Sequence, residues 1–235
     1  MDEAAGADAA GALRVVGEYG AFFVVAEATG ADWFPYNDLL EDDSHRRSSV
    51  AAARAMLAER AQVAVSAIDE RATASIQHLG TVARLVSPLL AVAAAYGQAP
   101  RLSTTTVRWR ALAGGPLEFA MLPDGFMPIE DVLTVIVEPL GAAFASTWHL
   151  SPHIIRGNVA SALAGAAKML GQARPQLRAD GERIARALLA KPSLHDAGSW
   201  PADGEFRRNN CCLFYRIPGA GTCGDCVLTA PISRR

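Results

Sequence analysis

The chain has 235 residues, 51% of them hydrophobic and 20% charged, with a mean hydropathy of +0.15. This composition excludes a disordered chain, a collagen-like repeat and a coiled coil, and it predicts a globular protein with a full core. The formal net charge of −2 is unevenly spread, because residues 1–44 carry ten acidic side chains against Arg14, whereas residues 207–235 carry five arginines against Asp225. A nucleic-acid partner is not expected for this basic end, since no recognition motif and no interleaved aromatic residues accompany it.

Neither a membrane span nor a secretory signal is predicted. The longest apolar stretch, residues 85–97, contains Ser87 and Pro88 and falls short of the roughly 20 residues that a bilayer crossing needs. The first residues are acidic and rich in alanine, whereas a secretory signal begins with basic residues followed by an apolar run. We therefore expect a cytoplasmic protein without a transmembrane segment, which leaves peripheral contact with a membrane open.

Hydrophobic periodicity predicts helices over most of the chain. A first helix is expected over residues 9–16, followed by an apolar run, residues 21–26, that suits either a buried strand or a short helix. A turn-rich segment, residues 29–36, precedes an alanine-rich stretch, residues 48–96, whose apolar positions recur at three and four spacing. We expect packed helices there, the last of them kinked or restarted at Pro88. Further helices are expected over residues 129–146, 158–171 and 182–189.

A small sheet is expected in the middle of the chain. Residues 103–112 alternate β-branched or aromatic side chains with polar ones, and residues 117–122 follow across the turn Gly114-Gly115-Pro116, which predicts a β-hairpin. The predicted fold class is therefore α+β and predominantly helical, with a small antiparallel sheet around residues 103–122 and a C-terminal cysteine-rich loop that binds a cluster.

We divide the chain into a helical body over residues 1–206 and a cluster-binding segment over residues 207–235 packed on it, because every cysteine lies in the second part. The four are Cys211, Cys212, Cys223 and Cys226. Four thiolates in one short segment can converge on a soft metal centre, and a reducing cytoplasm disfavours structural disulfides.

Three interpretations of these cysteines stay open on spacing alone. A tetrahedral zinc ion and a 2Fe-2S cluster both take four thiolates. Zinc ligands usually come as two CxxC-like pairs, but Cys211 and Cys212 are adjacent and would point apart in an extended chain, which favours the larger two-iron cluster. The third interpretation, a redox-active pair at Cys223 and Cys226, lacks the strand, CxxC and helix order of such proteins.

Residues 208–228 resemble the C-terminal signature of the FhuF-type ferric-siderophore reductase family. The shared features are a Cys-Cys pair, ten intervening residues and a CxxC motif, with Leu213, Tyr215 and Arg216 after the first pair. The resemblance implies one 2Fe-2S cluster per chain, held by all four cysteines as its metal ligands.

Two upstream stretches, residues 75–90 and 150–166, also resemble that family. The resemblance as a whole implies a cytoplasmic ferric-siderophore reductase, which reduces the Fe(III) of hydroxamate siderophores by one electron and releases Fe(II). The partners that follow are a ferric hydroxamate siderophore and an electron donor.

Outer-sphere electron transfer needs no general acid or base, so no catalytic residue is assigned beyond the cluster. Four side chains near the cysteines are candidates to surround the cluster or to dock a partner: Arg207, Arg208, Tyr215 and Arg216. The arginines can offset the charge of a reduced cluster, dock an electron donor or an anionic substrate group, or be solvated surface. Because no dinucleotide-binding or Walker motif occurs, the electron is expected from another protein such as a ferredoxin. The alternative function is a non-enzymatic regulatory or interaction protein that binds zinc or a cluster.

Three histidines and an asparagine need separate interpretations. His149 and His153 have the i, i+4 spacing of metal ligands on a helix, but Pro152 interrupts that helix, so packing or capping is expected for both. His78 has no visible partner in the sequence, and Asn158 is interpreted as a cap at the start of a helix.

Overall fold

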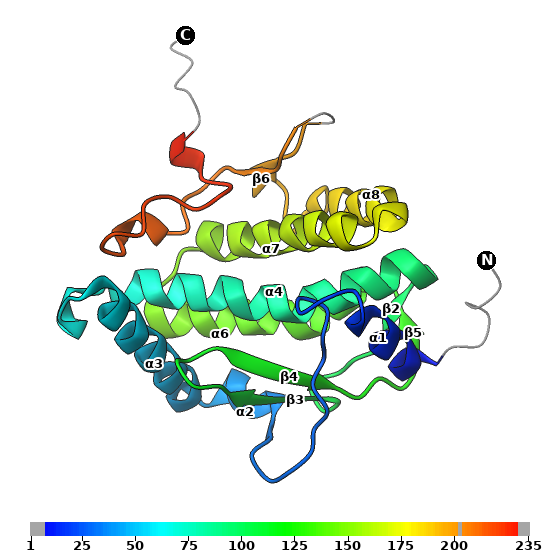
Figure 1. The fold of residues 1–235 in the computed structure, drawn as a ribbon, viewed down its shortest axis with the longest axis horizontal. Coiled ribbons are helices and arrows are strands. Elements are labelled where there is room, and N and C mark those ends of the chain that lie inside the picture. The colour runs from blue at the N-terminus through cyan, green and yellow to red at the C-terminus, as the bar shows by residue number, and fades with distance from the viewer. Residues whose placement is uncertain (1–7, 202–203, 230–235) are drawn as a thin grey trace.

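The computed structural model describes residues 8–201 and 204–229. Its elements lie in layers (Figure 1): a small sheet forms one side, α4 crosses the middle, α7 and α8 cover α4, and the C-terminal segment lies on α7. This arrangement confirms the predicted α+β class with helices dominant. Two of the five C-terminal arginines, Arg234 and Arg235, and residues 1–7 of the acidic N-terminal region lie outside the described residues.

The predicted hairpin is confirmed. Strand β3 (Val107–Ala111) pairs antiparallel with β4 (Leu117–Met121), and β1 (Phe34–Pro35) adds to the free side of β3. The turn requires glycine at Gly115, whose φ is +94° and whose Cβ, if present, would lie 2.5 Å from the carbonyl oxygen of Ser49. Two further short antiparallel pairs join β2 (Ala99–Pro100) to β5 (Phe126–Met127) and β6 (Gly198–Ser199) to β7 (Arg207–Arg208).

Helix α4 (Glu70–Tyr96) is the central element. Asp69 caps its first turn by accepting a hydrogen bond from the Ala72 amide at 3.0 Å, and Gly97 ends it in the left-handed conformation. The prediction that Pro88 restarts the helix is wrong, because α4 runs through it without a break. The proline ring is buried among the layers on both sides, so tertiary packing outweighs the local cost of the missing amide.

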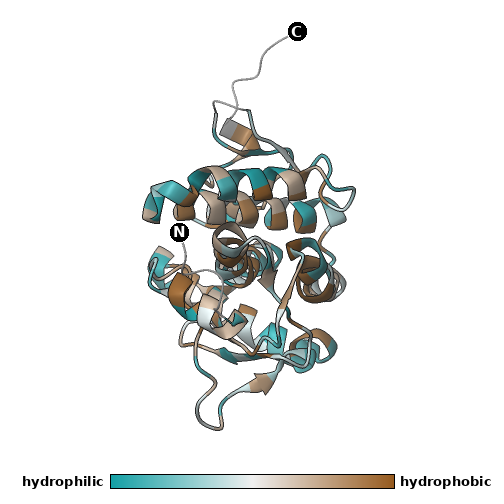
Figure 2. Ribbon diagram, turned by 90° about the vertical axis from the view of Figure 1, so that its right-hand side faces the viewer, coloured by the Kyte–Doolittle hydropathy of each residue, from teal (hydrophilic) through white to brown (hydrophobic). Residues whose placement is uncertain are grey.

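By length and composition, α4 could also cross a bilayer, which was not expected from the sequence. Its most apolar 18-residue window has a mean hydropathy of 1.5, but 61% of that window is buried inside the protein. Figure 2 shows these apolar residues at the centre of the molecule, enclosed by the other helices. Such burial is typical of the core helix of a soluble protein.

The remaining helices cover the predicted segments, although α3, α7 and α8 begin several residues earlier than predicted and α2 was not predicted. They are α1 (Ala9–Gly17), α2 (Tyr36–Glu41), α3 (Asp43–Ala61), α5 (Ile129–Val132), α6 (Glu138–Trp148), α7 (Pro152–Ala173) and α8 (Arg178–Leu189), with a π-helical turn (Leu133–Val137) between α5 and α6. Short 3₁₀ turns occur at Val65–Ala67, Pro175–Leu177, Phe214–Arg216 and Val227–Thr229.

The apolar run over residues 21–26 forms neither of the two predicted elements. Phe23 alone is buried in the core, while Phe22 and Val24 are 57% and 59% exposed. The run therefore passes over the outside of the fold and inserts one aromatic ring, a pattern that hydrophobicity by itself does not distinguish from a strand.

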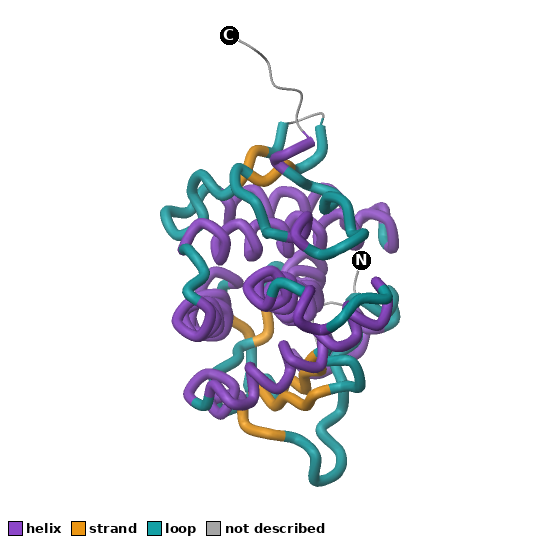
Figure 3. Tube along the Cα trace, turned by 90° about the vertical axis from the view of Figure 1, so that its left-hand side faces the viewer, coloured by secondary structure: helices purple, strands orange, loops and turns teal. Residues whose placement is uncertain are grey.

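The C-terminal segment is attached to the helices by two small apolar clusters. In the first, Ile217 packs with Ala58, Ile68 and Ala72, at the facing ends of α3 and α4. In the second, Phe206 packs on the α7 side with Ala160, Ala164 and Ala197. Figure 3 shows that the segment between and beyond these contacts is mostly loop.

Candidate metal centre

The cysteine loop lies on the first half of α7, next to the start of α4 (Figure 1). Two backbone hydrogen bonds hold it in place: the amide of Arg208 donates to the carbonyl of Asp225 at 3.0 Å, and that of Asn209 donates to the carbonyl of Ala197 at 3.1 Å. The loop approaches α7 most closely at Gly157, where a Cβ would lie 2.1 Å from Oδ1 of Asn210. A glycine is therefore required at this position of α7.

The chain turns sharply directly after the adjacent pair of cysteines. Leu213 has a φ of +70°, and Gly219 and Gly221 are also in the left-handed region. These turns fold the loop back, so that Cys212 meets Cys223 from the second pair with their Sγ atoms 3.4 Å apart. Two thiolates on one ion, bound at about 2.3 Å in a tetrahedron, would lie roughly 3.7 Å apart, so this pair is close to the separation of shared ligands.

The four thiols differ in their access to solvent. Cys212 and Cys226 are buried, whereas Cys211 and Cys223 are half-buried, and none of the four forms a disulfide. Within the described ranges, no three Cys, His, Asp or Glu side chains stand in a ready-made coordination sphere for a single ion. The cysteines thus gather in one loop without forming a mononuclear site.

Backbone amides point at the sulfur atoms. The amide of Leu213 donates to Cys211 Sγ and that of Leu228 donates to Cys226 Sγ, both at 3.3 Å. The pKa of Cys212 is lowered to about 6, first by its hydrogen bond with Cys223 and then by the amide of Phe214 and the charge of Arg208. The pKa of Cys223 is raised, first by the same hydrogen bond, because ionising both members would place two thiolates side by side.

Arg208 lies beneath the loop and is 1% exposed. Its Nη2 donates to Oδ1 of Asn158 at 2.6 Å, while Nε and Nη1 have no hydrogen-bond partner. Its charge lowers the pKa of Cys212 and opposes the upward shift that burial gives to the pKa of Cys211. A buried guanidinium with two unpaired N–H groups beside thiols calls for an anionic neighbour.

The side chains behind Arg208 correct two predictions. Asn158 does not cap α7, because the helix begins at Pro152 and Ser151 caps it; instead its Nδ2 lies 2.9 Å from the carbonyl of Ser75 and 3.2 Å from Nδ1 of His78. His78 therefore has a partner after all. Burial, together with the charge of Arg208, lowers the pKa of His78 to about 3, so its imidazole is neutral.

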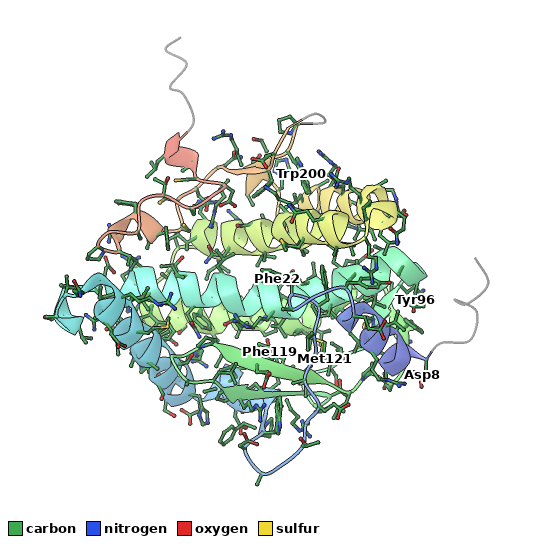
Figure 4. The ribbon with its side chains drawn as sticks, viewed as in Figure 1. Asp8, Phe22, Tyr96, Phe119, Met121 and Trp200 are labelled. Atoms are coloured by element: carbon green, nitrogen blue, oxygen red, sulfur yellow. The ribbon has the colours of Figure 1, made fainter. Side chains whose placement is uncertain are left out.

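A half-open cleft of about 550 Å³ adjoins the cysteine loop. It lies between α7, the start of α8 and the C-terminal segment, and Cys223 is the one of the four cysteines in its wall. Figure 4 shows Trp200, another lining residue, on the outer side of α7.

Residues 208–228 match the family model of the FhuF 2Fe-2S C-terminal domain. No curated protein matches the chain significantly. The match confirms the predicted resemblance at the cysteines, while the resemblance of residues 75–90 and 150–166 stays a prediction.

The FhuF 2Fe-2S domain and its clustered cysteines support a 2Fe-2S cluster as the metal centre of this protein. The structure fits such a group in two respects. Amide donors already point at Cys211 and Cys226, and the positive charge of Arg208, a buried side chain with unpaired N–H groups, acts on Cys211 and Cys212. Sulfur atoms of an anionic cluster are natural acceptors for such groups. That all four cysteines hold the cluster remains a prediction.

The other side chains that were predicted to surround the cluster or to dock a partner lie in different environments. Arg207 is exposed, beside Arg208 in the same strand. Arg216 pairs with Asp69 at 2.9 Å and so links the loop to the start of α4, and Tyr215 next to it is 49% exposed. Their roles toward a cluster or a partner stay predictions. His149 is the C-cap residue of α6, in the left-handed conformation, and His153 lies in the first turn of α7.

The chain of contacts from His78 through Asn158 to Arg208 was not predicted, although a signal for part of it was present. His78 and Asn158 are polar residues inside apolar helical stretches, and a buried polar residue is the informative exception to such a pattern, whereas nothing in the sequence marked Arg208 as buried. Which of them meet could not be read from the chain, because Asn158 lies 80 residues after His78 and 50 before Arg208.

Proposed function

We propose that this protein is a ferric-siderophore reductase. The observation that carries the proposal is the FhuF 2Fe-2S C-terminal domain, whose half-buried thiols at Cys211 and Cys223 lie where reaction partners can approach. A bound 2Fe-2S cluster supplies a carrier that takes up and gives off one electron at a time. One-electron reduction of a metal ion suits such a centre better than hydride or group transfer.

The proposed reaction moves one electron and forms no covalent bond. A donor protein of the ferredoxin class is oxidised by one electron, and Fe(III) in the siderophore is reduced to Fe(II). Oxygen ligands hold ferrous iron more weakly than ferric iron, so the reduced ion dissociates. The chain has to hold the reactants close together, and no side chain has to exchange a proton.

The contribution of the chain's own residues is electrostatic. Arg208 and the amides of Leu213 and Leu228 stabilise negative charge at the cysteines, which favours uptake of an electron. Thiolate ligands act in the opposite direction and keep the potential low. A low potential is needed, because each tenfold preference of a chelator for Fe(III) over Fe(II) costs about 59 mV.

We propose hydroxamate siderophores as the substrates and the cytoplasm as the location. The support is the resemblance of residues 208–228 to the FhuF signature and the presence of four thiols without a disulfide, which suits a reducing compartment. The electron donor is proposed to be a separate protein, because the sequence has no motif for a flavin or nicotinamide.

The test begins with protein purified without oxygen. We expect two irons and two sulfides per chain, a rhombic EPR signal after reduction, and close to one Fe(II) released per reduced protein when ferric trihydroxamate is added with a chromogenic Fe(II) chelator. Stoichiometric zinc, or a reduced cluster that produces no Fe(II), would overturn the proposal. Zinc would favour the non-enzymatic regulatory function.

The variants Cys212→Ser and Cys223→Ser test the assignment of the ligands. Each is expected to lower cluster content and Fe(II) release together. Reoxidation by hexacyanoferrate serves as the control, because it consumes the electron without any specific binding of a siderophore.

A further inference from the structure

The cleft beside Cys223 has the features of a binding site for a compact ligand. Small residues on the outer face of α7 form its floor, and a Cβ added at Gly165 would meet no atom within 4 Å. Two aromatic side chains, Trp200 and Phe206, also line the cleft and form an aromatic wall. They pack edge to face with ring centroids 6.1 Å apart. Arg186 fixes Trp200 by donating to its carbonyl and by lying 4.4 Å above its ring. The wall is therefore pre-formed.

The charges in the cleft are nearly balanced. Lys168 pairs with Glu205 at 2.7 Å, and the lining also contains a second cation, Arg178, and two further carboxylates, Glu182 and Asp225. With two cations and three carboxylates, the lining is slightly negative. It offers hydrogen-bonding groups at its rim without the excess positive charge that a polyanionic ligand would need.

We infer that this cleft is the site where the electron acceptor binds, and that the acceptor is an electrically neutral ferric chelate with oxygen ligands. Three singly charged bidentate ligands around Fe(III) give such a neutral complex. When this complex binds between Gly165 and Trp200, its metal lies beside Cys223, the cysteine in the wall of the cleft. This inference rests on the proposed function, and it adds where the substrate binds and on which side of the cysteine loop the electron leaves.

The redox balance is that of the proposed reaction. The reduced protein loses one electron on the side of Cys223, Fe(III) in the cleft becomes Fe(II), and no proton or ligand atom is transferred. The donor of the ferredoxin class restores the electron afterwards.

The test measures binding separately from reduction. A gallium(III) trihydroxamate has the same charge as the ferric complex but takes up no electron under these conditions, so calorimetry with the cluster-loaded protein reports binding alone. Gly165→Phe fills the floor of the cleft and is expected to weaken binding at least tenfold. Gln172→Trp, at an exposed lining position, is expected to weaken it as well.

Ala52→Phe is the matched control, because it adds the same ring to an exposed position of α3, which is not part of the lining. It is expected to bind gallium trihydroxamate as the wild type does. All variants should keep the cluster content and the hexacyanoferrate reoxidation rate of the wild type. A gallium tris-catecholate, which carries three negative charges, is expected to bind more weakly than the neutral complex.

The outcomes separate this inference from the proposed function. If the wild type binds no gallium trihydroxamate, or Gly165→Phe and Gln172→Trp bind it as tightly as the wild type, the cleft is not the acceptor site, even where Fe(II) release persists. Equal binding of the tris-catecholate would overturn the charge argument. If the gallium complex binds in the cleft and the variants weaken it, but reduced protein releases no Fe(II), the site stands and the reductase proposal fails.

Discussion

Among single residues, Arg208 joins the cysteine loop to the helical body. Burying a guanidinium costs several kcal/mol unless an opposite charge and hydrogen bonds compensate it. The described structure gives Arg208 one side-chain bond, to the neutral Asn158, and leaves Nε and Nη1 unpaired. An anionic cluster next to these groups would offset the cost of burying the guanidinium. Arg208 in turn would stabilise the negative charge of the cluster.

Replacing Arg208 by Gln is expected to lower the reduction potential of the cluster, because the extra negative charge of the reduced state loses a buried cation nearby. The shift should be on the order of tens of millivolts, since 59 mV corresponds to about 1.4 kcal/mol for one electron. Redox titration followed by EPR measures it. Arg208→Lys keeps the charge and should stay closer to the wild type.

Arg207→Gln provides the control for this experiment. Arg207 is the next residue in the chain but is exposed, so water screens its charge. An equal shift in the two Gln variants would show that burial of Arg208 does not matter, and the electrostatic argument would then be wrong.

His78 makes stability depend on pH. Its pKa is lowered to about 3 in the folded protein, from about 6.5 in an unfolded chain, because burial and Arg208 oppose the charged imidazole. Between these values the unfolded state binds more protons, so the free energy of unfolding rises with pH. The contribution of His78 is complete above about pH 6.5 and is lost as the pH falls toward 3.

Chemical denaturation of wild type and His78→Gln at several pH values between 4 and 7 tests this expectation. The wild type should lose more stability than the variant on acidification, by about 1 to 3 kcal/mol across this window. Parallel curves would show that His78 is accessible to protons in the folded state. Phe144, whose ring lies tilted beside the imidazole with centroids 5.3 Å apart, and Asn158 are neutral, so Arg208 is the charged group whose effect enters the comparison.

At the scale of elements, α7 carries two glycines with opposite roles. A Cβ at Gly157 would lie 2.1 Å from the buried Oδ1 atom of the half-buried Asn210, whereas one at Gly165 would meet open space. Gly157→Ala is therefore expected to destabilise the protein by about 1 to 3 kcal/mol, because the loop must shift. Gly165→Ala should stabilise it by about 0.5 to 1 kcal/mol, since alanine favours a helix interior.

Denaturation midpoints of the two variants measure the difference in their stability. Both carry a glycine-to-alanine substitution inside α7, so the gain in intrinsic helix propensity is the same in each. Stabilisation by Gly157→Ala would mean that the loop does not rest on α7 at this position. EPR of the reduced variants adds a second readout, because only Gly157→Ala should disturb the surroundings of the cysteines.

The elements themselves were largely predictable from the sequence, and the exceptions have physical reasons. The hairpin was indicated by its glycine turn, and α7 by apolar spacing, because both signals are local. The predicted restart at Pro88 was wrong because packing against α7 and the other elements around α4 keeps the helix continuous, while the predicted kink was not tested. The run over residues 21–26 was misjudged because its apolar side chains lie partly outside the core.

In the whole molecule, the cysteines could be predicted and their surroundings could not. Four cysteines in one short segment indicated a soft metal centre, but their spacing alone left zinc, a 2Fe-2S cluster and a redox pair open, and the resemblance to the FhuF signature favoured the cluster. The cleft, by contrast, combines Leu79 of α4, Gly165 of α7 and Cys223, which are distant along the chain. Only the packing of α7 between α4 and the C-terminal segment brings them together, and one sequence without coordinates does not contain that arrangement.

The distribution of buried residues predicts how the molecule responds to loss of the cluster. Among the described residues, the large core contains no buried residue after Leu194, and residues 207–229 are attached through Ile217, Arg208, the Arg216–Asp69 ion pair and the loop backbone. Removing the cluster should therefore loosen the loop while the layered helices stay folded. We expect far-UV circular dichroism to change little. Hydrogen exchange at the amides of Leu213 and Leu228, which donate to sulfur, should accelerate at least about tenfold.

Exchange measured by mass spectrometry on cluster-loaded and cluster-free protein distinguishes the two parts of the chain. Peptides from α4 and α8 serve as the internal reference, because their side chains pack in the large core. Ile217→Ala in the loaded protein should reproduce part of the effect, since it weakens the contact of the loop with α3 and α4 without removing a cysteine. If cluster removal instead accelerates exchange in α4 and α8 as strongly as in the loop, the two parts fold as one cooperative unit, and the cluster stabilises the whole molecule rather than the segment that binds it.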